Sequence, residues 1–272
     1  KASLTLSGFT ADKVYDGTTT ATLDASGAML SGLVGGDDVS IDLSGVTADF
    51  ADKDVGVGKA VTATGVALIG ADADNYDVVL APISASITPR TLNINGFTAV
   101  DRTYDGTTGV SVSAAVISFG AGDVIGDDDV SFDDSSLAAA TGTMADKNAG
   151  TGKAVTVGGL VITGADAGNY TIVATTTVDI ARVTLSVTGI PNLSKSYDGN
   201  QYFVSINTSS AVLNGIISAD EVTLNTSGIF GVSTSANVGT WNVFINGLSL
   251  GGGDAANYNL GTVIVSGTIQ GP

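Results

Sequence analysis

Residues 13–19 read Lys-Val-Tyr-Asp-Gly-Thr-Thr, and this short motif decides how the chain is organised. Its Tyr-Asp-Gly core recurs 89 residues later and again after a further 93. Recurrence at a period of this length predicts tandem copies of one folding unit. The three copies consist of Tyr15, Asp16, Gly17, Tyr104, Asp105, Gly106, Tyr197, Asp198 and Gly199.

A second motif, Asp-Ala-x-Asn-Tyr, follows each copy of the first. Its tyrosine lies 61, 66 and 61 residues after the Tyr-Asp-Gly tyrosine. The two motifs together predict three repeats, spanning residues 1–89, 90–181 and 182–272. The motif residues are Asp72, Asn75, Tyr76, Asp166, Asn169, Tyr170, Asp254, Asn257 and Tyr258.

The composition predicts an all-β fold. Glu221 is the only glutamate among 27 acidic residues, so nearly all the acids are aspartate, and the chain has 37 glycines. Asp and Gly favour turns, whereas Val, Ile and Thr, which are abundant here, favour strands. We expect three small β-sandwich-like or β-grasp-like repeats in an elongated rod, with at most one short helical turn in each.

Charge and missing residue types exclude several functions. The net charge of −17 argues against nucleic acid as a partner, which needs a basic patch. The absence of Cys and His excludes disulfides, a thiol nucleophile and a Ser-His-Asp triad. No stretch is long and apolar enough to predict direct membrane insertion. Since no acidic constellation stands out for catalysis, and threefold repetition of one small module is unusual for an active site, we do not expect an enzyme.

Two local features of the third repeat and the junctions are informative. Residues 241–245 read Trp-Asn-Val-Phe-Ile, which predicts a strand with Trp, Val and Ile on one face. Asn246-Gly247 then predicts a tight hairpin into a returning strand at Leu248. The junctions around Pro89 and Ala181 contain no glycine or serine run, so they predict short, stiff connections between repeats.

Structural roles are the preferred interpretation of both motifs. A cation two residues before each tyrosine (Lys13, Arg102 or Lys195) would cover the ring, and Asp-Gly would form a turn. The tyrosine hydroxyl would find a hydrogen-bond partner, often backbone. The alternative is an exposed tyrosine platform for sugars.

The Asp-Ala-x-Asn-Tyr motif predicts one helical turn, with its aspartate as the N-cap and its tyrosine in the core. Acidic pairs elsewhere suggest calcium as a weaker possibility, because calcium takes oxygen ligands. The best candidates are Asp127, Asp128 and Asp129. No other cofactor is expected.

The pattern resembles the YDG-type repeat of large bacterial surface proteins, including filamentous-haemagglutinin-like adhesins and other secreted exoproteins. The resemblance rests on Lys-x-Tyr-Asp-Gly-Thr-Thr, the acidic pair, Asp-Lys-x-x-Gly-x-Gly-Lys and Asp-Ala-x-Asn-Tyr. The third repeat lacks both lysines of the Asp-Lys segment. Its residues 238–243 look more like the related MBG-type β domains.

The resemblance implies export and display on the bacterial cell surface. It implies a stalk or spacer in an adhesin, with neighbouring repeats of the same chain as partners and the fragment monomeric. One alternative is a module for cell adhesion or biofilm formation that binds host or biofilm glycans or proteins. A further alternative is an extender stiffened by calcium.

Overall fold

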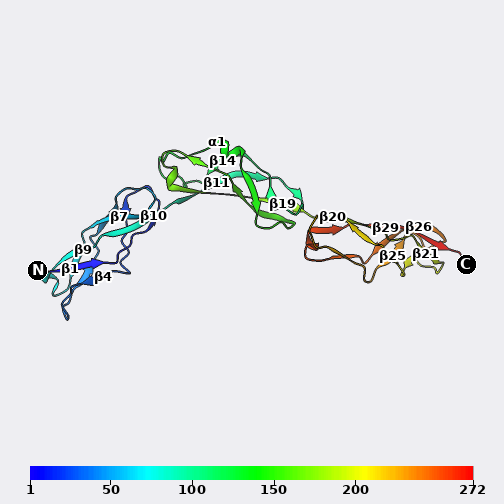
Figure 1. Ribbon diagram of the computed structural model, residues 1–272, viewed down its shortest axis with the longest axis horizontal. Coiled ribbons are helices and arrows are strands. Elements are labelled where there is room, and N and C mark those ends of the chain that lie inside the picture. The colour runs from blue at the N-terminus through cyan, green and yellow to red at the C-terminus, as the bar shows by residue number, and fades with distance from the viewer. Residues whose placement is uncertain (272) are drawn as a thin grey trace. The chain divides into compact units, whose positions relative to one another are not determined.

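The computed structural model describes residues 1–271 and confirms a mostly β chain with three tandem repeats (Figure 1). Repeat 1 contains ten strands and one 3₁₀ turn within its residues. Their bounds are β1 (Ala2–Ser7), β2 (Lys13–Val14), β3 (Thr20–Ala21), β4 (Met29–Ser31), β5 (Ser40–Asp42), β6 (Thr47–Phe50), β7 (Gly56–Thr64), β8 (Ala67–Ile69), η1 (Ala73–Asn75), β9 (Tyr76–Leu80) and β10 (Ile83–Thr88).

These strands form three small sheets in repeat 1. Their orders are β4-β1-β9, β2-β10-β7-β6-β3 and β5-β8. β1 runs parallel to β9, and β10 runs parallel to β2 and antiparallel to β7. The longer strands alternate buried apolar with more exposed residues, as in the buried Ile83, Ala85 and Ile87 of β10. Period-two patterning therefore determines which face enters the core.

Repeat 3 has the same three-sheet arrangement. Its sheets are β23-β20-β28, β21-β29-β26-β25-β22 and β24-β27. The bounds are β20 (Val183–Thr188), β21 (Leu193–Ser196), β22 (Tyr202–Phe203), β23 (Val212–Asn214), β24 (Thr223–Asn225), β25 (Phe230–Ser233), β26 (Gly239–Asn246), β27 (Ser249–Gly251), η3 (Ala255–Asn257), β28 (Tyr258–Leu260) and β29 (Val263–Gln270). The predicted strand at residues 241–245 is confirmed as β26, with Val243 and Ile245 buried on one face.

Repeat 2 differs from the other two repeats because β19 is one continuous strand. The corresponding segment is divided into β9 and β10 in repeat 1, and into β28 and β29 in repeat 3. β19 begins beside β11 in parallel and ends beside β17 in antiparallel pairing. The bounds are β11 (Arg90–Ala99), β12 (Arg102–Thr103), β13 (Gly109–Val110), β14 (Val112–Phe119), β15 (Ser131–Phe132), α1 (Asp134–Ala138), β16 (Thr141–Met144), β17 (Gly150–Gly158), β18 (Ile162–Thr163), η2 (Ala167–Asn169) and β19 (Tyr170–Ala181). In repeat 1 the same path is broken at Ala81-Pro82, where proline cannot donate to the ladder.

The expectation of at most one helical turn per repeat is wrong for repeat 2. It contains the five-residue helix α1 in addition to its 3₁₀ turn. Asp133 caps α1, since its side chain accepts a hydrogen bond from the Ser135 backbone N–H. The Asp-Asp-Ser-Ser segment thus supplied a capping signal that overrode the surrounding β pattern.

The predicted hairpin at Asn246-Gly247 is also wrong. β27 pairs with β24 and not with β26, so the chain leaves one sheet for another at this turn. Gly247 has φ +83°, and a Cβ there would lie 2.7 Å from the Gly228 carbonyl oxygen. Glycine is required by this close backbone approach as well as by the turn.

The contacts divide the chain into two compact units that do not coincide with the repeats. The first contains Lys1–Phe97, Ala114–Ala140 and Gly159–Ala174. The second contains Thr98–Ser113, Thr141–Gly158 and the described residues from Thr175 onward. Each unit therefore contains the place where two consecutive repeats meet.

The cores explain why the units are offset. In the first unit, Tyr15 and Ile87 of repeat 1 share one buried cluster with Leu92 and Tyr170 of repeat 2. In the second unit, the buried tyrosines and leucine at the meeting point of repeats 2 and 3 form a similar cluster. A further cluster around Val243 lies inside repeat 3. Apolar burial thus continues across the boundary between repeats. No helix among residues 1–271 is long and apolar enough to cross a membrane.

Candidate functional site: the joints between repeats

The Tyr-Asp-Gly motif forms the predicted turn, but the preceding cation has a different role from the predicted one. The Lys13 Nζ donates to the Asp16 Oδ1 at 2.7 Å and to the Thr18 and Thr20 carbonyl oxygens at 2.8 Å. It lies over the Phe50 ring rather than over Tyr15. The cation therefore closes the turn, because it neutralises the aspartate and satisfies two carbonyls that face it.

The same turn is built in the other two copies. Arg102 pairs with Asp105 at 2.5 Å, and Lys195 with Asp198 at 2.6 Å. The glycines have φ values of +77°, +79° and +77° in chain order, the left-handed conformation in which glycine alone is unstrained. This part of the motif is complete within each repeat.

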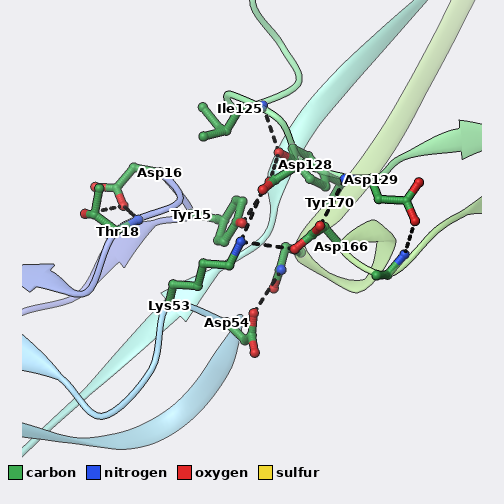
Figure 2. Close-up of polar contacts among 12 residues, drawn as sticks. Tyr15, Asp16, Thr18, Lys53, Asp54, Ile125, Asp128, Asp129, Asp166 and Tyr170 are labelled. Atoms are coloured by element: carbon green, nitrogen blue, oxygen red, sulfur yellow. Dashed lines mark hydrogen bonds and ion pairs between the residues drawn. The ribbon is translucent and has the colours of Figure 1, made fainter.

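The first tyrosine is buried against the next repeat (Figure 2). Tyr15 is fully buried, and its hydroxyl donates to the Asp128 Oδ2 at 2.8 Å. The same carboxylate oxygen accepts from the Tyr170 hydroxyl at 2.5 Å. The two rings meet edge to face with centroids 5.4 Å apart. The tyrosine hydroxyl thus has the expected partner, but it is a carboxylate 113 residues away and not a backbone group.

A lysine from the Asp-Lys segment completes the site. The Lys53 Nζ pairs with the Asp128 Oδ1 at 3.2 Å and with the Asp166 Oδ1 at 3.1 Å, and it lies 5.8 Å from the centroid of the Tyr15 ring. We call Tyr15, Lys53, Asp128, Asp166 and Tyr170 joint 1. Two of its members come from repeat 1 and three from repeat 2, so it connects the two repeats.

Backbone groups of repeat 1 are also held by repeat 2. The Asn169 Oδ1 accepts from the Val55 backbone N–H at 2.8 Å, and its Nδ2 donates to the Asp54 Oδ1 at 3.2 Å. Asn169 is buried, with 6% of its surface exposed. The asparagine of the second motif thus satisfies a loop of the preceding repeat.

The glycine of the Tyr-Asp-Gly turn has a second constraint in joint 1. A Cβ at Gly17 would lie 2.6 Å from the Cγ2 of Ile125. The Ile125 backbone N–H in turn donates to the Tyr170 hydroxyl at 2.9 Å. The apolar residue before the acidic pair therefore packs onto the turn of the preceding repeat.

The second unit contains an equivalent site, joint 2. Tyr104 and Tyr258 donate to the Asp220 Oδ2 at 2.8 and 2.6 Å, with rings 5.6 Å apart. Lys147 pairs with the Asp220 Oδ1 at 2.6 Å and with the Asp254 Oδ1 at 3.1 Å. The remaining contacts match too: Asn257 accepts from the Ala149 backbone N–H, and Gly106 lies against Ile217.

Burial and hydrogen bonding set the protonation of the joints. Desolvation is the main cause that raises the pKa of Tyr170 and Tyr258 to about 12. Burial also acts to raise the pKa of Asp128 and Asp220, but the hydrogen bonds from the tyrosines and lysine outweigh it, so both pKa values lie below the usual range. At neutral pH each joint therefore contains an ionised aspartate, a charged lysine and two neutral tyrosine donors.

The aspartates of the second motif do not act as the predicted N-caps. Asp72, Asp166 and Asp254 precede the three 3₁₀ turns, yet none makes a side-chain hydrogen bond to its own turn. Each instead accepts from the backbone N–H of the second acidic-pair residue, as Asp166 does from Asp129 at 3.0 Å. A turn of three residues offers few free N–H groups, and the neighbouring loop supplies a better donor. The predicted helical turn and the buried tyrosine are present in all three copies.

The calcium candidates are placed among protein donors. Asp128 is taken up by two tyrosines and a lysine, and the Asp129 Oδ2 accepts from the Ala165 backbone N–H at 3.1 Å. Among residues 1–271, no group of three or more acidic side chains is arranged to hold a metal ion. Asp127 has no part in joint 1. Both oxygens of the Asp128 carboxylate are therefore engaged by protein groups of joint 1.

Repeat 3 builds the corresponding loop with different residues. Ala236 stands where repeats 1 and 2 have Lys53 and Lys147. The Trp241 Nε1 donates to the Asn237 carbonyl oxygen at 2.8 Å, in the place where the Lys59 Nζ donates to the Asp54 carbonyl oxygen at 2.6 Å. An indole N–H thus replaces one missing lysine, while the lysine of the joint has no substitute.

Sequence reasoning identified most joint residues as structural but did not bring them together. It missed Lys53, Lys147 and Asp220, which lie 38, 43 and 116 residues from the tyrosines of the preceding repeat end, Tyr15, Tyr104 and Tyr104, that they approach in space only after folding. One signal was available. Lys53 and Lys147 occur in repeats 1 and 2, which are each followed in this sequence by another repeat with its acidic pair and Asp-Ala-x-Asn-Tyr motif. In repeat 3, alanine replaces the lysine.

Comparison with protein families identifies the repeats. The model of the YDG domain matches three times, at residues 1–85, 88–178 and 181–265. The chain belongs to the YDG domain family. The third YDG repeat is included despite its altered Asp-Lys segment. The boundaries placed at residues 89 and 181 lie within a few residues of the gaps between these matches.

Solved structures add little to the family assignment. The three N-terminal domains of the highly immunogenic outer capsid protein of bacteriophage RB49 align over all of both chains with 12% identity and a TM-score of 0.25. Drosophila N-cadherin EC1-4 aligns over all of this chain and 76% of its own with 8% identity and a TM-score of 0.25. Titin domains I67–I69 align over 97% of this chain and 96% of theirs with 6% identity and a TM-score of 0.24. These scores are too low to support an argument. No curated protein matches the chain.

Proposed function

We propose that these YDG repeats are a non-enzymatic spacer of a secreted bacterial adhesin, which holds a distal adhesive domain away from the cell surface. The observation that carries the proposal is the pair of joints, because a spacer transmits length only if consecutive repeats are held in a fixed orientation. Charge-assisted hydrogen bonds and buried aromatic rings are suited to that task. The cell-surface location comes from the family resemblance.

The connections between repeats support the same role. One residue, Pro89, separates β10 from β11, and one residue, Arg182, separates β19 from β20. Connections this short restrict the orientations open to the next repeat, and each joint then selects among them. The acidic surface would keep long arrays of such repeats soluble and apart.

Small-angle X-ray scattering on residues 1–272, with calcium and then with chelator, tests the proposal. A compact globule of this length should have a radius of gyration of about 18–19 Å, and three repeats of roughly 40 Å in line should give about 35 Å. We expect the large value in both buffers. A compact value would contradict the spacer role, and a large value only with calcium would favour the calcium-stiffened extender.

A second candidate function concerns repeat 3 alone. Tyr15 and Tyr104 are buried, so they cannot present rings to a sugar. Tyr197 and Tyr202 are 50% and 54% exposed, and Tyr202 lies near the partly exposed Phe230 with ring centroids 6.4 Å apart. These exposed rings suit stacking against a host or biofilm glycan. Loss of glycan-array binding in Tyr202→Ser, with unchanged thermal unfolding, would support this module.

A further inference from the structure

The N-terminal end of repeat 1 presents the same residues that repeats 2 and 3 use in the joints. Asp37 takes the position of Asp128 and Asp220, and it accepts from the Tyr76 hydroxyl at 2.6 Å. The Tyr76 hydroxyl also accepts from the Val34 backbone N–H at 3.1 Å, as in the other two copies. Asp72 accepts from the Asp38 backbone N–H at 2.9 Å. We call Val34, Asp37, Asp72, Asn75 and Tyr76 the acceptor face.

This face differs from its two counterparts in exposure. Asn75 is exposed, whereas Asn169 and Asn257 are 6% and 2% exposed because the preceding repeat covers them. Val34 is 59% exposed, whereas Ile125, at the equivalent position, packs against the core of the first unit. The acceptor face is thus preformed and apolar at one edge.

Charge and hydrogen-bonding capacity define what fits this surface. In both joints the carboxylate receives one hydroxyl from its own repeat and, from the preceding repeat, a second hydroxyl and a lysine. Asp37 has the hydroxyl of its own repeat, that of Tyr76, as a partner. Beside the joints, Asn169 and Asn257 each accept a hydrogen bond from a backbone N–H in the loop that follows the lysine of the preceding repeat. An occupant must therefore bring a tyrosine, a lysine and a free backbone N–H in that arrangement.

We infer that the acceptor face binds the C-terminal end of another YDG repeat that carries both the Tyr-Asp-Gly turn and the Asp-Lys loop. Repeat 1 itself has such an end, and repeat 3, with Ala236 in place of the lysine, does not. The inference rests on the proposed role of the joints as connectors. It assigns a partner to a surface outside both joints and specifies which type of repeat end it accepts.

The experiment uses an extended chain in which residues 1–88 are placed directly before residues 1–272. Lys1 then occupies the single connecting position that Pro89 and Arg182 occupy elsewhere. Because the chain has no cysteine, spin labels can be attached to Val57→Cys in the added copy and Met29→Cys in the original copy, both highly exposed positions. Double electron–electron resonance then reports the distance distribution across the new joint.

We expect one narrow distance peak, lost when Asp37→Ala is introduced in the original copy or Lys53→Met in the added copy. The 272-residue chain with Asp37→Ala should still unfold in one cooperative thermal transition, a few degrees below wild type because Tyr76 loses one hydrogen bond, which shows that the variant folds. A broad distribution that Asp37→Ala leaves unchanged would overturn the inference. Labels at Val57→Cys and Val116→Cys across joint 1 separate the two claims: if this pair is narrow while the added joint is broad, the inference alone fails, and if both are broad, the spacer role fails too.

Discussion

Tyr104 and Tyr197 occupy the same turn in consecutive repeats, but 2% of one and 50% of the other is exposed. Their local structure is alike, since each is followed by an aspartate paired with the preceding cation and a glycine with positive φ. Only Tyr104 contacts an acidic-pair carboxylate, Asp220, in the next repeat. The comparison separates two functions in one motif: the Asp-Gly turn is a local structure, and the tyrosine belongs to the joint.

The largest expected effect comes from removing the central carboxylate. Asp220→Ala leaves two buried hydroxyls and a lysine without their acceptor, and we expect a loss of about 2–4 kcal/mol in the free energy of unfolding. Urea denaturation of the full chain measures it. Asp37→Ala is the matched control and should cost only about 1 kcal/mol in the 272-residue chain, because Asp37 accepts one tyrosine hydroxyl, that of Tyr76, and pairs with no lysine. Equal losses would contradict the distinction between joints and exposed ends.

Alkaline pH should weaken the joints. The folded pKa of Tyr170 and Tyr258 is about 12, above the value of 10.0 for a free tyrosine. Below pH 10 both states are protonated and stability is full; between pH 10 and 12 the unfolded state loses protons first, so stability falls. The urea midpoint should decline over this range. A double variant, Tyr170→Phe with Tyr258→Phe, should flatten that decline, and an identical slope would contradict the assignment.

Acid should also weaken the joints, in this case through their aspartates. The pKa values of Asp128 and Asp220 are lowered in the folded state. Their contribution is present above the unfolded pKa, near 4, and is lost as pH falls through the folded value. Urea midpoints between pH 6 and 2 measure this loss, and Asp128→Asn should reduce its steepness. An unchanged acid profile in Asp128→Asn would show that this carboxylate is not stabilised by the joint.

Two glycines sharpen the comparison further. Gly17 and Gly199 share a φ of +77°, so alanine at either position should cost about 1–2 kcal/mol from backbone strain. Gly17→Ala should cost about 1 kcal/mol more, because its Cβ would meet Ile125 of the next repeat, whereas nothing lies within 4 Å at Gly199. Thermal unfolding of the two variants decides this, and equal shifts would mean that Ile125 moves without cost.

The smallest expected effect is the removal of one hydroxyl. Tyr104→Phe should lower stability by about 1–2 kcal/mol, since Asp220 loses a charge-assisted hydrogen bond, and Tyr197→Phe should change it by less than about 0.5 kcal/mol. The difference between the two urea midpoints is the relevant quantity. A larger effect at Tyr197 than at Tyr104 would reverse the account.

The sequence was sufficient where structure depends on neighbours along the chain. The alternation in residues 241–245 predicted β26, and Asp-Gly predicted a turn with positive φ, because both depend on local geometry. The partner of Tyr15 could not be predicted, since Asp128 lies in another repeat and no local rule selects it among 26 aspartates. The Asn246-Gly247 hairpin was wrong for a similar reason: the turn chemistry was present, but the pairing of β27 with β24 determined where the chain went.

The most direct test of the joints is the distance distribution across joint 1. Spin labels at Val57→Cys and Val116→Cys lie in repeats 1 and 2, at side chains that are 92% and 81% exposed. We predict a single narrow peak in double electron–electron resonance that broadens with Asp128→Ala and stays narrow with Asp37→Ala. A distribution that is broad in the unmodified joint, or that Asp128→Ala leaves narrow, would contradict the claim that these tyrosines, lysine and aspartates hold consecutive repeats together.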